Sequence, residues 1–174
     1  MAVPRTVAAS RRARKESADR ARSRTRRHPP PKGVAGRSGY VLEAQVGFLL
    51  RCAHQRATEV FYAVMAPFAV TPTQFAALAK IDDLGSVSQN RLGRLTAMDP
   101  ATISGVIGRL TARGLVRQSR SRRDARLLRL ALTPAGRTAI QRMKAVAAEV
   151  SRRTLEPLGP ARSAALLRAL SVIG

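Results

Sequence analysis

Apolar side chains recur at helical spacing along most of residues 41–173, and this pattern is interrupted once. Steps of three or four residues between apolar positions are typical of helices that bury one face. Residues 115–118 and 127–132 instead alternate between apolar and polar side chains, as the two short strands of a hairpin do. The pattern therefore predicts a mainly α-helical chain with one small β-hairpin embedded in it.

Two short helices are predicted directly before the hairpin. Ser88 and Asp99 each precede an apolar helical pattern, where a side-chain oxygen can accept the unpaired N–H groups of the first turn. The first helix is expected over residues 87–97, with Leu92 and Leu95 facing inward. The second begins with Pro100 at its first position and ends before Gly114, a residue suited to the position after a helix.

The second helix has one apolar face and an opposite face almost without bulk. Its predicted core stripe consists of Ile103, Val106, Ile107 and Leu110. Its outer face consists of Ala101, Thr102, Ser104, Gly105, Gly108, Arg109 and Ala112. A helix with such small outward side chains can lie deep in a DNA major groove, and the hairpin beside it is basic enough to reach a flanking minor groove. This arrangement predicts a winged helix-turn-helix.

The helices at the two ends of the chain carry apolar seams that a thin domain cannot easily cover. The first runs from Val41 to Pro67, another follows a predicted cap at Thr71, and the last two follow Thr133 and Pro160. Seam positions of the terminal helices are Leu42, Val46, Leu49, Ala53, Val60, Phe61, Val64, Ile140, Met143, Ala147, Val150, Ala164, Leu167, Leu170 and Ile173. These seams predict a homodimer, and packing within one chain is the alternative.

Charge and composition favour a polyanionic partner. The 174 residues hold 32 Lys and Arg against 10 Asp and Glu, a formal net charge of +22. Phosphate neutralisation supplies most non-specific affinity for nucleic acid. Aromatic residues make up 3% of the chain, which argues against recognition of single strands by stacking. The single cysteine excludes an internal disulfide framework, and no apolar run is long enough to span a membrane, so no membrane partner is expected.

The sequence predicts a basic tail followed by one domain. Residues 1–39 hold 12 basic and 2 acidic residues and almost no bulky apolar ones, so this segment is expected to be disordered. It is interpreted as an arm that strengthens phosphate contact, with an inert extension and an organelle transit peptide as alternatives. Residues 40–174 form the domain, with a DNA-binding lobe at about 70–133 and dimerisation helices at about 41–66 and 134–173.

The chain resembles the MarR family of bacterial transcriptional regulators from about Val41 to Ile173. The matching motifs are Ser88-Gln89-Asn90-x-Leu92-Gly93, Met98-Asp99-x-Ala101-Thr102, Arg113-Gly114-Leu115-Val116, Asp124-x-Arg126 and Leu132-Thr133-Pro134-Ala135-Gly136, in this order. The resemblance implies a winged helix-turn-helix whose terminal helices form the dimer. It further implies a cytoplasmic bacterial homodimer that binds a pseudo-palindromic operator on double-stranded DNA and releases it when a small molecule binds.

Candidate DNA contacts fall into base-reading and phosphate-binding positions. Thr102, Ser104 and Arg109 project from the outer face of the second helix and are the expected base readers. Arg91 and Arg94, on the preceding helix, are expected at phosphates; the family usually has an acidic residue where Arg91 stands. The predicted DNA-binding set also includes Ser88, Gln89, Pro100, Ala101 and Gly105.

The tip of the predicted hairpin is crowded with arginine. Arg120, Arg122, Arg123 and Arg126 surround one acid, Asp124. Such crowding is self-repulsive in water and is relieved in the narrow minor groove of DNA, although a charge run can also be a solvated face. The family resemblance implies that Asp124 braces the hairpin and that Arg126 enters the groove.

An effector pocket and a redox role are further expectations from the resemblance. The family's usual pocket lies between the dimer helices and the DNA-binding lobe, which suggests Arg51, His54, Phe61 and Phe75 as lining residues for an aromatic or phenolic acid. One branch of the family senses peroxides through a cysteine early in the first helix, but Gly47 occupies that place here. Cys52 therefore remains either a thiol sensor or a small buried apolar residue.

Enzymatic function is not expected. Of the two histidines, His28 lies in the tail and His54 in the first helix, and neither has Ser and Asp nearby to form a catalytic triad. No phosphate-binding glycine loop is present. No metal site or cofactor is predicted. The sequence thus favours a sequence-specific transcriptional regulator, expected to be a ligand-responsive repressor. A sequence-independent nucleoid-type protein and a redox regulator are the alternatives.

Overall fold

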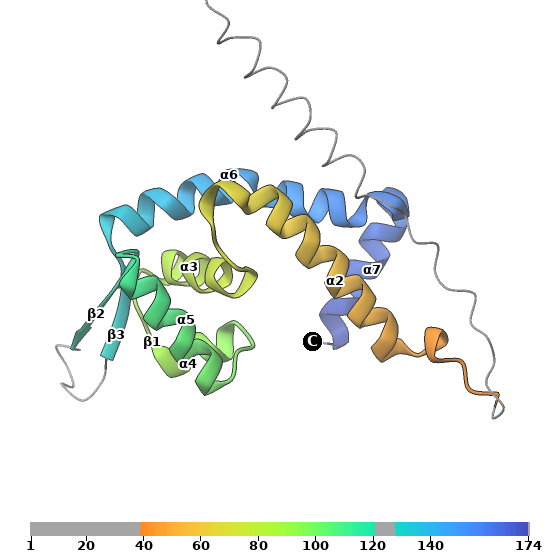
Figure 1. The fold of residues 1–174 in the computed structure, drawn as a ribbon, viewed down its shortest axis with the longest axis horizontal. Helices are drawn as coiled ribbons and strands as arrows, with labels where there is room; N and C mark the ends of the chain where they lie inside the picture. Colours follow the sequence, from red (N-terminus) through yellow and green to blue (C-terminus); the bar gives the residue numbers. More distant parts are fainter. Residues whose placement is uncertain (1–38, 121–127, 174) are drawn as a thin grey trace, which may run out of the picture. The chain divides into compact units, whose positions relative to one another are not determined.

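A computed structural model describes residues 39–120 and 128–173 of the chain (Figure 1). The chain divides into two compact units, residues 1–50 and 51–174. The predicted tail lies outside the described residues except for Gly39. The predicted wing residues Arg122, Arg123, Asp124 and Arg126 also lie outside them.

The described part of the first unit contains a short helical turn and the start of a long helix. The 3-10 helix η1 spans Leu42–Ala44, and α2 spans Val46–Met65. Gln45 between them is extended, with φ −81° and ψ 134°, and its Nε2 donates a hydrogen bond to the Val41 carbonyl at 3.1 Å. The predicted helix from Val41 is therefore wrong at its start, because the extended backbone at Gln45 interrupts the helical hydrogen bonds.

The second unit contains the rest of α2 and a mixed helical and stranded lobe. In chain order the further elements are η2 Ala66–Phe68, α3 Pro72–Leu84, β1 Val87–Ser88, α4 Gln89–Leu95, α5 Pro100–Ala112, β2 Val116–Arg120, β3 Leu128–Leu132, α6 Pro134–Leu155, η3 Glu156–Leu158 and α7 Gly159–Ile173. This confirms a mainly helical winged helix-turn-helix. Pro67 lies in the turn that ends the first long helix, as predicted.

The sheet has one more strand than the predicted hairpin. Its order is β1-β3-β2, and both pairings are antiparallel. Val87 pairs with Leu130 and Ser88 with Arg129, so the prediction of a helix from residue 87 is wrong. Val87 is 2% exposed, and pairing with β3 satisfies its backbone while its side chain enters the core.

Helix starts in this lobe follow the predicted side-chain caps, with one exception. Thr71 forms a complete capping box with Gln74, and Thr133 accepts a hydrogen bond from the Gly136 N–H at 3.0 Å. Asp99 likewise caps α5. Ser88 occupies the cap position of α4, but its side chain makes no capping hydrogen bond, so that prediction is wrong. Position 91, where a Glu or Gln would complete a capping box with Ser88, is occupied by Arg91.

The core of the second unit gathers side chains from every layer of the lobe. Its buried apolar residues are Phe61, Met65, Val70, Ala77, Leu78, Ile81, Val87, Leu92, Ile103, Val106, Ile107, Leu110, Val116, Leu130, Leu132, Ile140 and Met143. The predicted stripe of α5 is thus fully internal. Leu95, which the sequence places inward, is 45% exposed, since α4 ends at that residue and the chain turns away.

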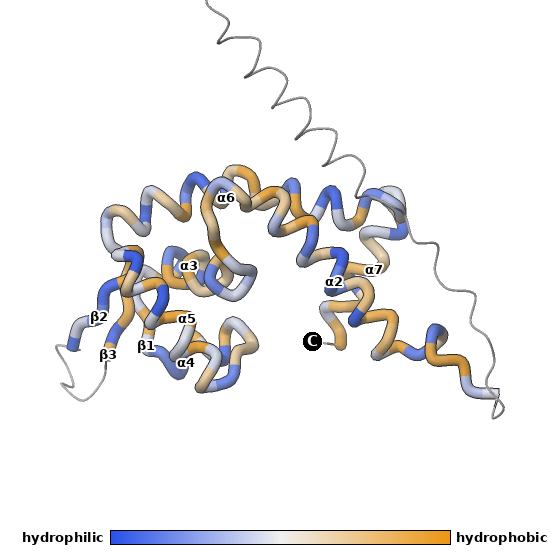
Figure 2. The backbone as a smooth tube through the Cα atoms, in the orientation of Figure 1, coloured by the Kyte–Doolittle hydropathy of each residue, from blue (hydrophilic) through white to orange (hydrophobic). Residues whose placement is uncertain are grey.

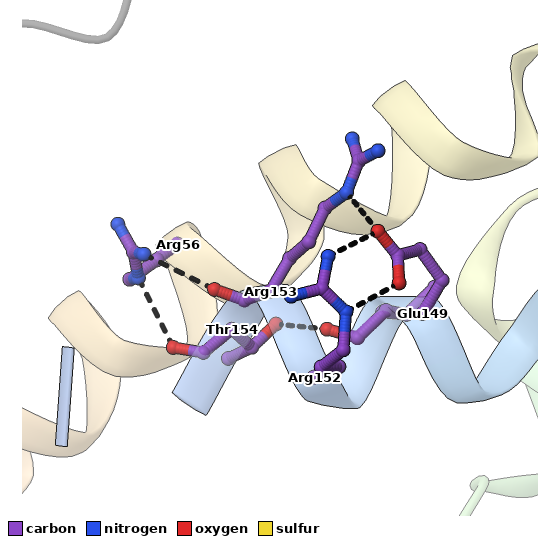
Figure 3. Close-up of polar contacts among 6 residues, drawn as sticks. Arg56, Glu149, Arg152, Arg153 and Thr154 are labelled. Carbon is purple, nitrogen blue, oxygen red and sulfur yellow. Dashed lines mark hydrogen bonds and ion pairs between the residues drawn. The ribbon is translucent and has the colours of Figure 1, made fainter. Parts of the chain in front are cut away.

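Helix α6 is tied to α3 and α2 by polar contacts at two places. The Lys144 ammonium lies 2.7 Å from a carboxylate oxygen of Asp82 and 2.9 Å from one of Asp83, on α3. Near the end of α6, the Arg56 guanidinium of α2 donates to the carbonyls of Arg153 and Thr154, both at 3.2 Å (Figure 3). These bonds satisfy carbonyls that a helix end leaves without an intrahelical partner.

An ion-pair cluster also marks the last turns of α6 (Figure 3). Glu149 accepts hydrogen bonds from Arg152 and Arg153 of the same helix. These guanidinium groups lower the pKa of Glu149 to about 2, because they stabilise the charged form. The carboxylate is therefore ionised throughout the neutral range.

The last helix leaves its apolar seam uncovered in the single chain. None of the residues of α7 is buried, and Leu167 and Ile173 are 54% and 73% exposed. Figure 2 shows several apolar residues along this helix. Across residues 39–120 and 128–173 no single helix is long and apolar enough to cross a membrane, although the bent pair Val46–Phe68 and Pro72–Leu84 meets the criteria of length and composition.

The end of α5 and the start of α6 meet at a tight backbone junction. The Thr133 hydroxyl donates to the Gly114 carbonyl at 2.6 Å, and the Thr133 N–H donates to the Leu115 carbonyl at 3.1 Å. Gly136 lies against the same Leu115 carbonyl, so a Cβ at Gly136 would overlap that oxygen. Only glycine fits there without a shift of the backbone.

We expect Gly136→Ala to lower the free energy of unfolding by about 1–3 kcal/mol, because the added methyl group overpacks a backbone junction. Gly108→Ala is the matched control, since a Cβ at Gly108 meets nothing within 4 Å. That change is expected to raise stability by about 1 kcal/mol through helix propensity. Urea unfolding of both variants measures the difference, and equal stabilities would contradict the junction as described.

Candidate nucleic-acid interface

The turn between α4 and α5 is fixed by backbone and side-chain hydrogen bonds. The Thr96 hydroxyl donates to the Leu92 carbonyl at 2.7 Å, and the Met98 N–H donates to the Gly93 carbonyl at 2.9 Å. Ala97 between them adopts a left-handed conformation with φ 50°. A Cβ at Gly93 would lie 3.1 Å from the Met98 carbonyl, so the absence of a side chain allows this close turn.

Both ends of α5 are capped by local hydrogen bonds. Asp99 accepts the Thr102 N–H at 2.8 Å, and Pro100 occupies the first helical position, as predicted. At the other end Gly114 has φ 68°, and its N–H donates to the Thr111 carbonyl at 2.9 Å. The Leu115 N–H reaches the Leu110 carbonyl at 3.0 Å, which completes a Schellman motif. The helix is therefore held at a defined length between Asp99 and Gly114.

The outward face of α5 carries the predicted base-reading residues. Pro100, Ala101, Thr102, Ser104 and Arg109 are exposed, and Gly105 is half-buried. The Arg109 guanidinium lies over Gly105, since its Nη1 is 3.4 Å from where a Cβ of Gly105 would stand. The structure thus brings Gly105 and Arg109 together, and Arg109 lies back along the helix toward its N-terminus.

The predicted phosphate contacts lie on α4, and the first of the predicted wing arginines lies at the end of β2. Arg91 and Arg94 of α4 and Arg120 at the end of β2 are exposed. Gln89 and Ser88 are half-buried, and the backbone of Ser88 belongs to β1 rather than to a helix. Ser88 therefore belongs to a strand and does not cap α4 with its side chain.

Among the described residues, the carboxylates that form ion pairs do so with cations of α3 and α6, away from the helix-turn-helix surface. Within residues 39–120 and 128–173, the ion pairs join Lys80 and Lys144 to Asp82 and Asp83 of α3, or join residues of α6 to one another. Arg91, Arg94 and Arg109 have no carboxylate partner among these described residues. Their charge remains uncompensated on the helix-turn-helix surface, which suits a phosphate backbone.

Two of the four predicted effector residues lie together. The rings of Phe61 and Phe75 have centroids 5.9 Å apart at an interplanar angle of 63°. Phe61 is 7% exposed and belongs to the core. His54 and Arg51 are exposed and precede Phe61 on α2 by seven and ten residues, which separates them from it by about 10 and 15 Å along the helix axis.

Cys52 is not buried, contrary to one of its two predicted roles. Cys52 is exposed in the single chain and is not disulfide-bonded. The interpretation of Cys52 as a small buried residue is therefore wrong for the single chain, because it lies on a face of α2 that the lobe does not cover. The structure adds no further feature that favours a thiol sensor.

Known proteins resemble this chain in both sequence and fold. The family model described as MarR family matches residues 70–127, which span the helix-turn-helix and the first strand of the hairpin. The HTH-type transcriptional repressor NicR of Pseudomonas putida is 34% identical over 138 residues, 79% of this chain and 87% of that protein. The chain belongs to the MarR family. It is accordingly a DNA-binding transcriptional regulator and not an enzyme.

Solved structures of similar regulators share the fold. A probable transcriptional regulator from Pseudomonas aeruginosa is 44% identical, with a TM-score of 0.70, over 75% of this chain and 97% of that one. Bordetella bronchiseptica BpsR, whose DNA binding is regulated by 6-hydroxynicotinic acid, is 35% identical, with a TM-score of 0.73, over 77% of this chain and 96% of that one. The helix-turn-helix and sheet therefore belong to an established MarR-type architecture.

Sequence patterns did not indicate the roles of two arginines in this MarR-family lobe. Arg113, at the end of α5, donates to the carbonyls of Ala69 and Phe68 at 2.8 and 3.0 Å. Arg129 of β3 donates to the hydroxyl and the carbonyl of Ser86. Both residues join segments more than 40 positions apart, so periodicity could not reveal them. In the sequence, Arg113-Gly114 stands out only as part of a motif that resembles the family.

The Arg113 contacts fix the end of α5 to the turn that follows α2. Ala69 has a left-handed conformation with φ 49°, and Phe68 packs against the core. The Arg142 guanidinium of α6 lies 5.9 Å from the centroid of the Phe68 ring. This turn therefore contacts both α5 and α6, and Arg113 holds the end of α5 against it.

Arg113→Ala is expected to lower the free energy of unfolding by about 1 kcal/mol and to weaken operator binding, because α5 loses its attachment to the Phe68–Ala69 turn. The slope of log affinity against log salt is expected to stay unchanged. Arg94→Ala is the control and is expected to reduce that slope by about 1 without a loss of stability. Fluorescence anisotropy over a salt series measures both slopes. A reduced slope for Arg113→Ala would place its guanidinium on a phosphate and contradict the positioning role.

Proposed function

We propose that this chain is a ligand-responsive repressor that binds a pseudo-palindromic operator as a homodimer in the bacterial cytoplasm. The observation that carries the proposal is the outward face of α5, which combines small side chains with Thr102, Ser104 and Arg109. A helix of this kind fits the major groove, where base edges differ in their donor and acceptor groups. Repression is the activity of the relative NicR, which is similar over most of the chain.

Contacts to the DNA backbone come from α4 and the sheet in this proposal. Arg91 and Arg94 bind phosphates beside the groove that α5 enters. Both are exposed, and neither forms an ion pair with a carboxylate of the described residues. In this proposal Asp124 braces the hairpin and Arg126 enters the minor groove, with the charges of Arg120, Arg122 and Arg123 close by in the sequence. The basic tail adds charge that strengthens these contacts without reading sequence.

Dimerisation covers the terminal helices. Helix α7 has no buried residue although every third or fourth position is apolar, and in the first unit Val46 and Leu49 of α2 are 69% and 51% exposed. A second copy of the chain would remove these surfaces from water at about 25 cal/mol per Å² of apolar area. Two-fold symmetry then places the two α5 helices about one DNA turn apart, some 34–36 Å.

The effector in this proposal is an aromatic acid. BpsR responds to 6-hydroxynicotinic acid and is 35% identical to this chain. The paired rings of Phe61 and Phe75 offer apolar contacts. Arg51 and His54 lie about 10 to 15 Å from Phe61 along α2, so they would contribute donors for a carboxylate only where the dimer assembles. A ligand releases DNA only if it binds the DNA-free arrangement of the two lobes more tightly than the DNA-bound one.

Operator preference and ligand release test the proposal together. We expect the wild-type protein at about 150 mM salt to bind an inverted-repeat fragment from its own promoter roughly 10³-fold more tightly than a scrambled fragment. Addition of 6-hydroxynicotinic acid or a hydroxybenzoic acid is expected to weaken operator binding, since both combine a planar ring with a carboxylate. Cyclohexanecarboxylic acid is the control, because it keeps the charge and lacks the ring.

Equal affinity for the operator and the scrambled fragment would contradict the repressor and support a sequence-independent DNA-binding protein. Release by the aromatic and the saturated acid alike would contradict an aromatic effector. Release by peroxide that is absent in Cys52→Ser would instead support the thiol-based alternative.

Leu170→Glu is expected to convert the dimer to monomers, since it places a charge in the apolar seam of α7, where Leu170 is 38% exposed in the single chain. Arg168→Glu is the matched control, because it changes the same helix at a polar, exposed position. Multi-angle light scattering measures the mass of both variants. A monomeric wild-type protein, or a dimeric Leu170→Glu variant, would contradict dimerisation through α7.

A further inference from the structure

The side chain of Asp99 holds Thr102 at two points. One carboxylate oxygen, Oδ1, accepts the Thr102 backbone N–H at 2.8 Å. The other, Oδ2, accepts the Thr102 hydroxyl at 2.6 Å. The first bond is an ordinary helix cap, but the second is not needed for capping. It fixes the hydroxyl of a residue that the proposed function places at the base edges.

The chemistry of the pair determines where the hydroxyl proton points. The hydrogen bond from the Thr102 side chain, followed by backbone N–H groups, lowers the pKa of Asp99 below its usual range, so the carboxylate is ionised at neutral pH. An ionised carboxylate has no proton to donate. The Thr102 hydroxyl must therefore donate to Asp99, and only its lone pairs remain for an outside partner.

Thr102 lies on the same side of α5 as Arg109. The buried stripe of Ile103, Val106, Ile107 and Leu110 faces the core, and positions 102, 105 and 109 follow one another at helical spacing along one exposed flank. The Arg109 guanidinium lies back over Gly105, toward Thr102. A group that only accepts is thus followed along one flank by a group that only donates.

We propose that Asp99 makes Thr102 an acceptor-only reader of the operator, which selects an amino group on the base that it faces. In the major groove, adenine N6 and cytosine N4 offer such a donor, whereas guanine O6 and thymine O4 do not. The inference rests on the proposed function, because it requires α5 to enter the major groove. It adds the chemical class of base that one position of each half-site must present.

Two nearly isosteric substitutions test this inference. Thr102→Val removes the hydroxyl and keeps the branched shape of the side chain. Asp99→Asn keeps the cap, because its amide oxygen can still accept the Thr102 N–H. Its amide NH₂ then faces the Thr102 oxygen and donates to it, so the hydroxyl proton becomes free to point toward DNA. The two variants thus delete and reverse the same hydrogen-bonding group.

The experiment measures the affinity of each protein for a selected operator and for every single base-pair substitution in one half-site. The wild-type protein is expected to prefer adenine or cytosine at one position by about three- to tenfold. Thr102→Val is expected to lose that preference, and Asp99→Asn is expected to shift it toward guanine or thymine. Thr111→Val is the matched control, because it makes the same change at an exposed position of α5 to which no DNA contact is assigned.

Several outcomes would overturn the inference. An unchanged preference profile for Thr102→Val would show that the hydroxyl reads no base. Loss of the preference in Thr102→Val, together with an unchanged profile for Asp99→Asn, would show that Asp99 does not set the direction of the hydroxyl. If the wild-type protein prefers no operator over scrambled DNA, the proposed function itself fails and the inference fails with it. Thermal unfolding of each variant establishes that the compared proteins are folded.

Discussion

The burial of one face of α5 is the constraint on which the DNA-binding lobe depends. Ile103, Val106, Ile107 and Leu110 are all at most 2% exposed, and they contact a core that also includes residues of α3, α4 and the sheet. Because interiors are close-packed, a helix held by four such side chains has little freedom to rotate about its axis. The rotation of α5 then decides which residues face outward, so packing of the core, without DNA, sets the outer face.

The fixed rotation of α5 keeps its small residues on the outward face. Ala101, Gly108 and Ala112 leave the backbone near the surface, and Arg109 lies along the helix over Gly105 instead of extending from it. Gly105 and Gly108 weaken the helix by about 1 kcal/mol each relative to alanine. The core stripe and the two caps offset that cost, so the helix can keep a slender outer face without losing its position.

Features set by local chemistry were predictable from the sequence, and features set by distant contacts were not. The caps at Thr71, Asp99 and Thr133 depend on neighbours within three residues, and the structure confirms all three. The strand at Val87 depends on Leu130, 43 positions away, so helical spacing was a poor guide there. Exposure of Leu95 likewise follows from where α4 ends, which propensity locates poorly.

The site shows the same division between local and distant causes. The sequence located Thr102 and Arg109 on the outer face of α5, because a buried stripe of four apolar residues leaves only one other side available. It did not indicate that Arg113 bonds to the carbonyls of Phe68 and Ala69, since an arginine directly after the predicted DNA-binding helix looks like another phosphate contact. Charge alone therefore overstates the number of arginines available to DNA.

The distribution of acidic residues explains why part of the positive charge stays available. Asp82 and Asp83 bind Lys144, and Glu149 binds Arg152 and Arg153, so these carboxylates neutralise cations of α6 rather than of α4 or α5. Asp99, the acid of the helix-turn-helix, accepts hydrogen bonds from its own helix. A protein with the same net charge but acids beside Arg91 and Arg94 would bind phosphate less well, because attraction between charges falls with distance and is screened by salt. Placement of the acids, more than the total of the bases, therefore makes this surface the more attractive one for a polyanion.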